Sequence, residues 1–173
     1  MTPDDGIWID MWLPVGSPIY RSGVREGLEV AGDAWVAALS SVGIRSISTV
    51  RNVPEPTHSE ICFAGIGHGE VVDDHGRKLV GVTAWRSREG TLLQTALYRR
   101  RDRTLPDLLA IEPEQRIIAQ GILANQVTDL SALHVPMPSG KGLARDLGLR
   151  LAEVFSDIQE VVFEERPPEV EES

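Results

Sequence analysis

The sequence predicts a single α+β domain in which a mixed or largely antiparallel sheet is covered by helices. Strand-length runs joined by turn residues fill the centre of the chain, roughly residues 60–98. A strongly periodic helical segment precedes them at 24–42, and further helical segments follow from residue 112. Strands gathered in one block with helices outside it favour α+β over alternating βαβ units.

Composition sets limits on size and on partners. The 173 residues suit one domain, and 42% hydrophobic content is ample for a single core. The net charge of −9 disfavours binding to nucleic acid or to an anionic membrane surface, because both require cations. Part of the acidic excess lies in 164–173, which we expect to be a disordered tail after a domain at 1–163.

The cysteine count and the hydrophobic pattern favour a cytoplasmic protein. Cys62 is the only cysteine, so an internal disulfide is excluded, and with four scattered histidines it offers no zinc cluster. No apolar run approaches the roughly 20 residues that span a bilayer. The first residues also lack the basic start and long apolar stretch of a secretory signal.

Local patterns assign the elements of the first part of the chain. An apolar run predicts a strand at 7–15, ended by Pro14 and Gly16. The helix at 24–42 carries apolar residues three and four positions apart, and Gly43 stops it. These residues are Leu28, Ala31, Trp35, Ala38, Leu39 and Val42. A strand at 44–53 and a proline-rich loop at 54–58 follow.

The centre and the C-terminal part carry hairpins and then helices. Expected strands are 61–65, 70–72, 78–86 and 91–98, with turns at 67–69, 73–76 and 87–90. A helix at 112–127, loosened at Gly121, a linker at 136–142 and a helix at 143–162 complete the chain. The glycines at 65, 67 and 69 lack dinucleotide-binding spacing and indicate a tight turn. We assign the arginine run 99–101 and all four histidines to loops or the surface.

One motif stands out in the centre. Gly76-Arg77-Lys78-Leu79-Val80-Gly81 follows Gly69-Glu70 across a hairpin turn and precedes Arg86 and Arg88. This arrangement resembles the lipoate–protein ligase and octanoyl transferase catalytic domain of the biotin/lipoate protein ligase superfamily. The resemblance covers roughly 7–111 and is clearest at 60–98.

The resemblance implies an enzyme of protein modification. A ligase of this family attaches lipoate or octanoate to a lysine of an acyl-carrier domain through an acyl-adenylate, using ATP and Mg²⁺. The implied partner is the lipoyl acceptor domain of a 2-oxoacid dehydrogenase or of a glycine-cleavage protein. The choice among lipoate, octanoate and biotin stays open.

Lys78 is the first predicted catalytic residue. A lysine at the start of a strand, aimed by a tight hairpin, places a compact charge beside the carbonyl and phosphate of an acyl-adenylate. The matching lysine of the family contacts that intermediate, so we expect Lys78 on the concave face near Gly69 or Glu70. An ordinary hairpin lysine is the alternative.

Five further residues are predicted to bind substrate. They are Gly69, Glu70, Gly81, Arg86 and Arg88. Glycine leaves room for a ligand or a neighbouring backbone, and a guanidinium matches the geometry of phosphate. For the two arginines a solvated turn is the alternative.

Cys62 offers a second route to the same product. It lies sixteen residues before Lys78, which resembles the cysteine–lysine arrangement of the octanoyl transferase branch. There a thiol takes the acyl group from a carrier protein as a thioester, without ATP. A cation such as Lys78 favours the reactive thiolate. Its apolar neighbours Ile61 and Phe63 make a small core residue the alternative.

The N-terminus departs from the family pattern. The family's Arg-Arg-x-Gly-Gly-Gly segment precedes the strand that matches 7–13, and Trp85 and Gln94 replace a smaller polar residue and a histidine. We therefore expect an N-terminally truncated domain with an uncovered apolar surface along 7–13 that includes Trp8, Ile9 and Trp12. A partner that supplies the segment, or a non-catalytic binding protein of the same family, follows as an alternative.

Overall fold

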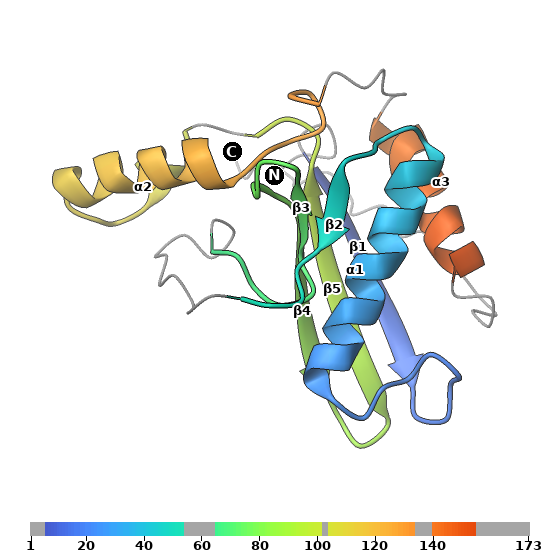
Figure 1. Ribbon diagram of the computed structural model, residues 1–173. Helices are drawn as coiled ribbons and strands as arrows, with labels where there is room; N and C mark the ends of the chain where they lie inside the picture. Colours follow the sequence, from blue (N-terminus) through green and yellow to red (C-terminus); the bar gives the residue numbers. More distant parts are fainter. Residues whose placement is uncertain (1–5, 54–64, 102–103, 134–139, 155–173) are drawn as a thin grey trace, which may run out of the picture.

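The computed structural model describes residues 6–53, 65–101, 104–133 and 140–154. Within them lie five strands, three α-helices and one 3₁₀ helix (Figure 1). The strands are β1 (Gly6–Pro14), β2 (Ile47–Thr49), β3 (Val71–Asp73), β4 (Lys78–Arg86) and β5 (Gly90–Tyr98). The helices are α1 (Val24–Ser41), η1 (Leu105–Leu108), α2 (Pro113–Gln126) and α3 (Gly140–Val154).

The strands form one sheet in the order β1-β5-β4-β3-β2, and every neighbouring pair is antiparallel. β1 pairs along its whole length with β5, from Gly6 opposite Tyr98 to Pro14 opposite Gly90. β4 pairs with the other side of β5, so β5 is the central long strand. The predicted α+β class with an antiparallel sheet is confirmed.

Period-two alternation gives the sheet one covered and one open face. In β1 the side chains of Ile7, Met11 and Leu13 are buried, whereas Trp8 and Trp12 are exposed. The buried set packs into the core beneath the helices. We call the opposite side, turned away from α1 and α3, the open face.

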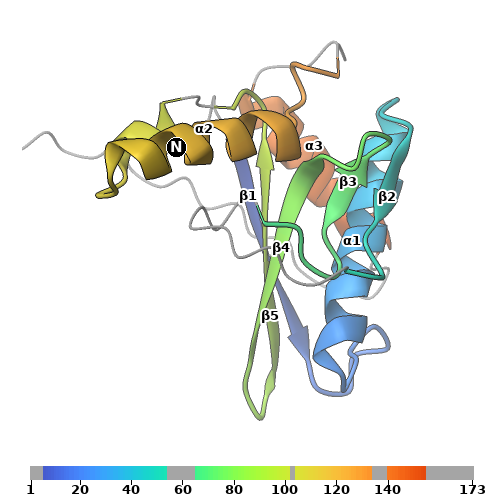
Figure 2. The ribbon, with the colours of Figure 1, turned by 60° about the vertical axis from the view of Figure 1, so that its left-hand side comes forward.

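Helices α1 and α3 lie side by side on the covered face (Figures 1 and 2). α1 places alanines and the buried Trp35 against the sheet, as its apolar spacing predicts. α3 contributes Leu143, Leu147 and Leu151, four residues apart and therefore on one side of the helix. Among the described helices none combines the length and the apolar character needed to cross a membrane.

Helix α2 projects across the end of the sheet, away from this core (Figure 2). It begins with a capping box between Glu112 and Gln115, and it runs through Gly121 without the predicted interruption. Its last turn is capped by Arg101, whose Nη1 donates to the carbonyls of Leu123 and Val127 at 2.5 and 2.6 Å. Arg101 therefore belongs to the fold and not to a solvated surface run.

The other differences from the predicted elements concern boundaries. The strand expected at 44–53 is only Ile47–Thr49, because Ile44 turns into the core directly after α1. Ile9 packs against the core cluster and not on the exposed surface, since its odd position in β1 faces the helices. The predicted strand at 61–65, the linker and the acidic tail lie wholly or largely outside the described residues.

The close packing of α1 on the loop before β3 can be tested with two glycines of the same helix. A methyl group at Gly32 would come within 2.3 Å of the Gly69 carbonyl oxygen, whereas at Gly27 it would meet nothing within 4 Å. We expect Gly32→Ala to cost about 1–3 kcal/mol through this clash. Gly27→Ala should gain about 0.5–1 kcal/mol through helix propensity. Urea unfolding of both variants measures the difference, and equal stabilities would contradict it.

Candidate functional site

A register shift at the start of β4 sets the direction of Lys78. Val71 pairs with Val80 and Val72 pairs with Lys78, so Leu79 has no partner in β3. Leu79 and Val80 both belong to the core on the covered face. A bulge of this kind lets two successive residues face one side and re-aims the next one. Without the bulge, Lys78 would face the core like Val80, which lies two positions further along the strand. The bulge at Leu79 turns the side chain of Lys78 to the opposite face of the sheet.

Lys78 forms a buried ion pair with Glu70. Its Nζ lies 2.6 Å from Glu70 Oε1 and donates to the Gly65 carbonyl at 2.7 Å. The side chains are 2% and 8% exposed, respectively. Glu70 precedes the core residue Val71 in an extended strand, so alternation places its carboxylate on the open face. The expected proximity of Lys78 to Glu70 is confirmed.

Backbone groups fix both members of the pair. Glu70 Oε2 accepts from the amide of Gly67 at 2.6 Å, and the Lys78 carbonyl accepts from the amide of Thr128 at 2.8 Å. Val127 also forms a parallel bridge with Lys78. A buried pair repays its desolvation only when such additional hydrogen bonds are present.

Burial has the largest effect on the pKa of Glu70. Loss of hydration raises the pKa of this carboxyl group, and the charge and hydrogen bond of Lys78 and the Gly67 amide oppose the rise without cancelling it. Glu70 therefore holds its proton more tightly than a solvated glutamate. The pair combines a buried ammonium with a carboxylate that is costly to keep ionised.

The loop that carries Glu70 is held against α1. Gly69 adopts a φ of +80°, and a side chain there would meet the backbone of Leu28 at 2.5 Å. Beside it, His68 Nε2 lies 2.8 Å from Glu29 of α1, and Arg51 bridges Glu29 and Asp33. His68 is thus a structural contact between loop and helix, which its sequence neighbours did not indicate.

The hairpin before Lys78 is organised by Asp73. Its Oδ1 accepts from the amides of His75 and Arg77, and its Oδ2 contacts the Arg77 guanidinium at 2.7 Å. Gly76 takes a φ of +73° in this turn. Arg77 of the motif therefore shapes the turn that presents Lys78.

The structure does not place Arg86 and Arg88 with Lys78. Eight residues of extended strand, about 26 Å, separate Lys78 from Arg86. The guanidinium of Arg86 contacts the Ser22 carbonyl and the Tyr20 hydroxyl, so it ties β4 to the segment before α1. Arg88 is exposed in the β4–β5 turn. Gly81 is buried opposite Ala96, near the Lys78 end of the strand, and Cys62 lies outside the described residues.

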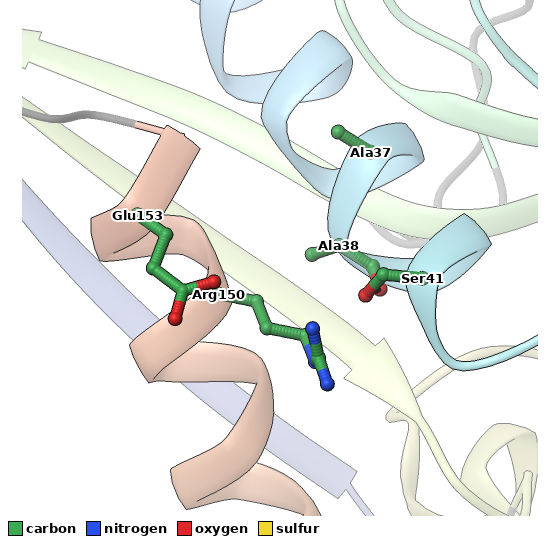
Figure 3. A pocket seen from close by; sticks show the side chains of 5 residues that line it. All are labelled: Ala37, Ala38, Ser41, Arg150 and Glu153. Atoms are coloured by element: carbon green, nitrogen blue, oxygen red, sulfur yellow. Dashed lines mark hydrogen bonds between the residues drawn. The ribbon is translucent and has the colours of Figure 1, made fainter.

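Lys78 and Glu70 line neither the cavity between α1 and α3 nor a second cavity beside α2. A shallow cavity of about 180 Å³ opens between α1 and α3, on the covered side of the sheet (Figure 3). Its lining is Ala37, Ala38, Ser41, Arg150 and Glu153. In the part of the chain that the structure describes, no group of three or more His, Cys, Asp or Glu side chains is arranged to hold a metal ion.

The raised pKa of Glu70 makes stability depend on pH in a defined direction. The contribution of this group is fully present below the ordinary pKa of 4.5 and is lost as pH rises through the folded-state value. Glu70→Gln cannot ionise, so its stability relative to the unaltered chain should increase as pH rises above 4.5. Urea unfolding of both proteins at several pH values measures this trend. A difference that stays constant, or moves the other way, would contradict it.

Comparisons with known proteins find the fold but no close relative. No protein-family model and no curated protein sequence matches the chain. Biotin protein ligase from Aquifex aeolicus in complex with biotin and ATP is similar in structure, with a TM-score of 0.53 and 12% identity over 88% of this chain and 50% of that chain. Lipoate-protein ligase A bound with ATP gives a TM-score of 0.55 and 10% identity over 86% and 51%. This chain therefore has the catalytic-domain fold of biotin and lipoate ligases and spans about half the length of the proteins it matches.

Proposed function

We propose that this chain acts in protein lipoylation, joining lipoate or octanoate to a lysine of an acyl-carrier domain through an acyl-adenylate. The observation that carries the proposal is the buried ammonium of Lys78, held between Glu70 and Gly65 at the start of a bulged strand. The shared fold supports it, because the similar structures include a lipoate-protein ligase bound with ATP. The Gly-Arg-Lys-Leu-Val-Gly motif resembles the lipoate–protein ligase pattern, so the proposal names lipoate or octanoate, while the sequence itself leaves the choice with biotin open.

The chemistry needs a fixed cation twice. In the first step the carboxylate of the acid attacks the α-phosphorus of ATP, and pyrophosphate leaves. In the second step the lysine amine of the acceptor attacks the acyl carbonyl, loses a proton and releases AMP. Both steps build negative charge on oxygen, which a preorganised ammonium stabilises most where water is excluded. Mg²⁺ would arrive as the complex of ATP, with phosphate oxygens among its ligands.

Glu70 would regulate the availability of that cation. In the substrate-free chain its carboxylate holds Lys78 in place at 2.6 Å. An incoming phosphate would compete with Glu70 for the ammonium of Lys78. Because the pKa of Glu70 is raised, its carboxylate takes up a proton more readily, and this lowers the cost of separating it from Lys78. Glu70 is thus a positioning residue, and Lys78 is the group that would contact the reacting oxygens.

One incubation tests the proposal. The chain is mixed with a lipoyl acceptor domain from a 2-oxoacid dehydrogenase or a glycine-cleavage protein, ATP, Mg²⁺ and lipoate, and the acceptor is analysed by intact mass. A parallel sample holds octanoyl-carrier protein without ATP, which isolates the thioester route through Cys62. Both samples are repeated with a peptide carrying Arg-Arg-x-Gly-Gly-Gly. An unmodified acceptor in all samples would overturn the proposal and favour a non-catalytic binding protein.

Substitution of Lys78 should affect transfer far more than substitution of the only other lysine, Lys141 in α3. We expect Lys78→Met to slow lipoyl transfer by about 10²–10³-fold, the typical loss for one preorganised donor. Lys141→Met should leave the rate unchanged. Initial rates at saturating lipoate measure both, and urea unfolding shows whether each variant is folded at the assay temperature. A folded Lys78→Met variant with an unaltered rate would remove Lys78 from the reaction.

A further inference from the structure

In the part of the chain that the structure describes, no strand pairs with the outer edge of β1, which is nine residues long. β1 is the last strand of the sheet on its side (Figure 1). Between Ile7 and Leu13, the backbone has hydrogen-bond partners only in β5 among the described residues. Its other N–H and C=O groups point outward and can bind a further strand.

β1 lacks most of the features that usually protect such an edge. Proteins block exposed edges with charged side chains, above all lysine, and with internal proline, bulges or very short strands. β1 carries one charged residue, Asp10, but it has no lysine, its only proline is at the last position, and its pairing with β5 is regular throughout. A long and regular edge of this kind is typical of a surface that receives another strand.

The open face beside this edge presents two indoles with a carboxylate between them. Trp8 and Trp12 are 59% and 45% exposed, and Asp10 lies between them on the same face. Asp10 Oδ1 accepts from Trp8 Nε1 at 2.6 Å, and Oδ2 lies 3.4 Å from Gln94 Nε2. The carboxylate is therefore held in place at the surface, with an indole two positions to either side of it along the strand.

We propose that β1 binds an extended segment of another polypeptide that carries a lysine or arginine opposite Asp10. In a strand added to β1, the residue opposite Asp10 lies on the open face about 5 Å away. The residues two positions to either side lie opposite Trp8 and Trp12. A cation at the centre gains an ion pair with Asp10 and cation–π contacts with the indoles, and apolar neighbours cover the rings.

The negative charge of Asp10 and of the whole chain favours a basic segment of another protein at this edge over a second copy of the chain. In the symmetric antiparallel pairing centred on Asp10, two carboxylates would face each other about 5 Å apart and repel. Each copy also carries a net charge of −9. A basic segment from a different protein meets neither penalty. The inference rests on the strand edge and on Trp8, Asp10 and Trp12 beside it, and it does not require the proposed lipoylation activity.

Selection from a library tests the chemistry of the segment directly. Random nine-residue peptides are displayed and selected on the full chain, and in parallel on Asp10→Lys. We expect the unaltered chain to enrich peptides with a central Lys or Arg and apolar residues two positions to either side. Asp10→Lys should enrich Asp or Glu at the centre. Failure to enrich any consensus, or a consensus that is unchanged on Asp10→Lys, would overturn the proposal.

A synthetic peptide of the selected consensus then tests strand addition. Fluorescence anisotropy of the labelled peptide should show about tenfold weaker binding to Trp12→Ala. The matched control is Trp85→Ala, which removes an indole that is more exposed than Trp12 (59% against 45%) and lies two strands away from the edge. Equal losses for the two variants would place the peptide elsewhere.

Methylation of the backbone amides of the peptide distinguishes strand addition from binding through side chains alone. Every second amide of a strand donates to its neighbour, so methylating one alternate set should abolish binding and methylating the other should not. Equal effects of the two sets would overturn strand addition. Sedimentation of the chain at increasing concentration shows whether it forms a dimer. If a dimer forms, is lost in Asp10→Lys and prevents the peptide from binding, the edge of β1 binds a second copy of the chain and the proposal is overturned.

Discussion

The buried contact between Lys78 and Glu70 is the constraint on which the central part of this structure depends. Two charged groups that are almost fully removed from water require precise partners, because an unpaired member would cost several kcal/mol. The Gly67 amide and the Gly65 carbonyl supply those partners, and the bulge at Leu79 frees Lys78 to reach them. Replacement of such a pair by apolar residues is often energetically neutral, so the pair by itself is weak evidence for stability.

This contact also explains why α1 contains glycine where it meets the loop. The loop that delivers Glu70 must approach the helix closely, and Gly69 and Gly32 are the residues that allow it. The polar contacts of Glu29 with His68 and Arg51 then fix the loop laterally. The helix therefore has two functions in the fold: its apolar side fills the core, and its residues 28–33 position the loop that carries the carboxylate.

The sequence predicts the strands and turns that depend on neighbouring residues. It does not predict the contacts between segments that are far apart in the chain. Alternation and turn residues were sufficient for β4 and β5, and the hairpin motif was sufficient to bring Lys78 to Glu70. The bulge at Leu79, by contrast, arises from competition between two strands, and the bridge from Val127 to Lys78 joins residues 49 positions apart. Arg86 was grouped with Lys78 by sequence spacing, but an extended strand carries it to the other end of the sheet. The helix around Gly121 persists because its caps at Glu112 and Arg101 outweigh the propensity of one glycine.

Small side chains lie between the outer edge of β1 and the buried ion pair, on the same side of the sheet. In the paired strands Trp8 lies opposite Ala96, which in turn lies opposite Gly81 of β4. This row crosses the open face from the free edge of β1 towards the strand that begins with Lys78, over two strand spacings or about 10 Å. Ala96 and Gly81 are themselves buried, so this row is covered and does not form an exposed path from the edge to the ion pair. The aromatic edge and the cation are therefore parts of one side of the sheet, whereas α1 and α3 cover the other and stabilise it.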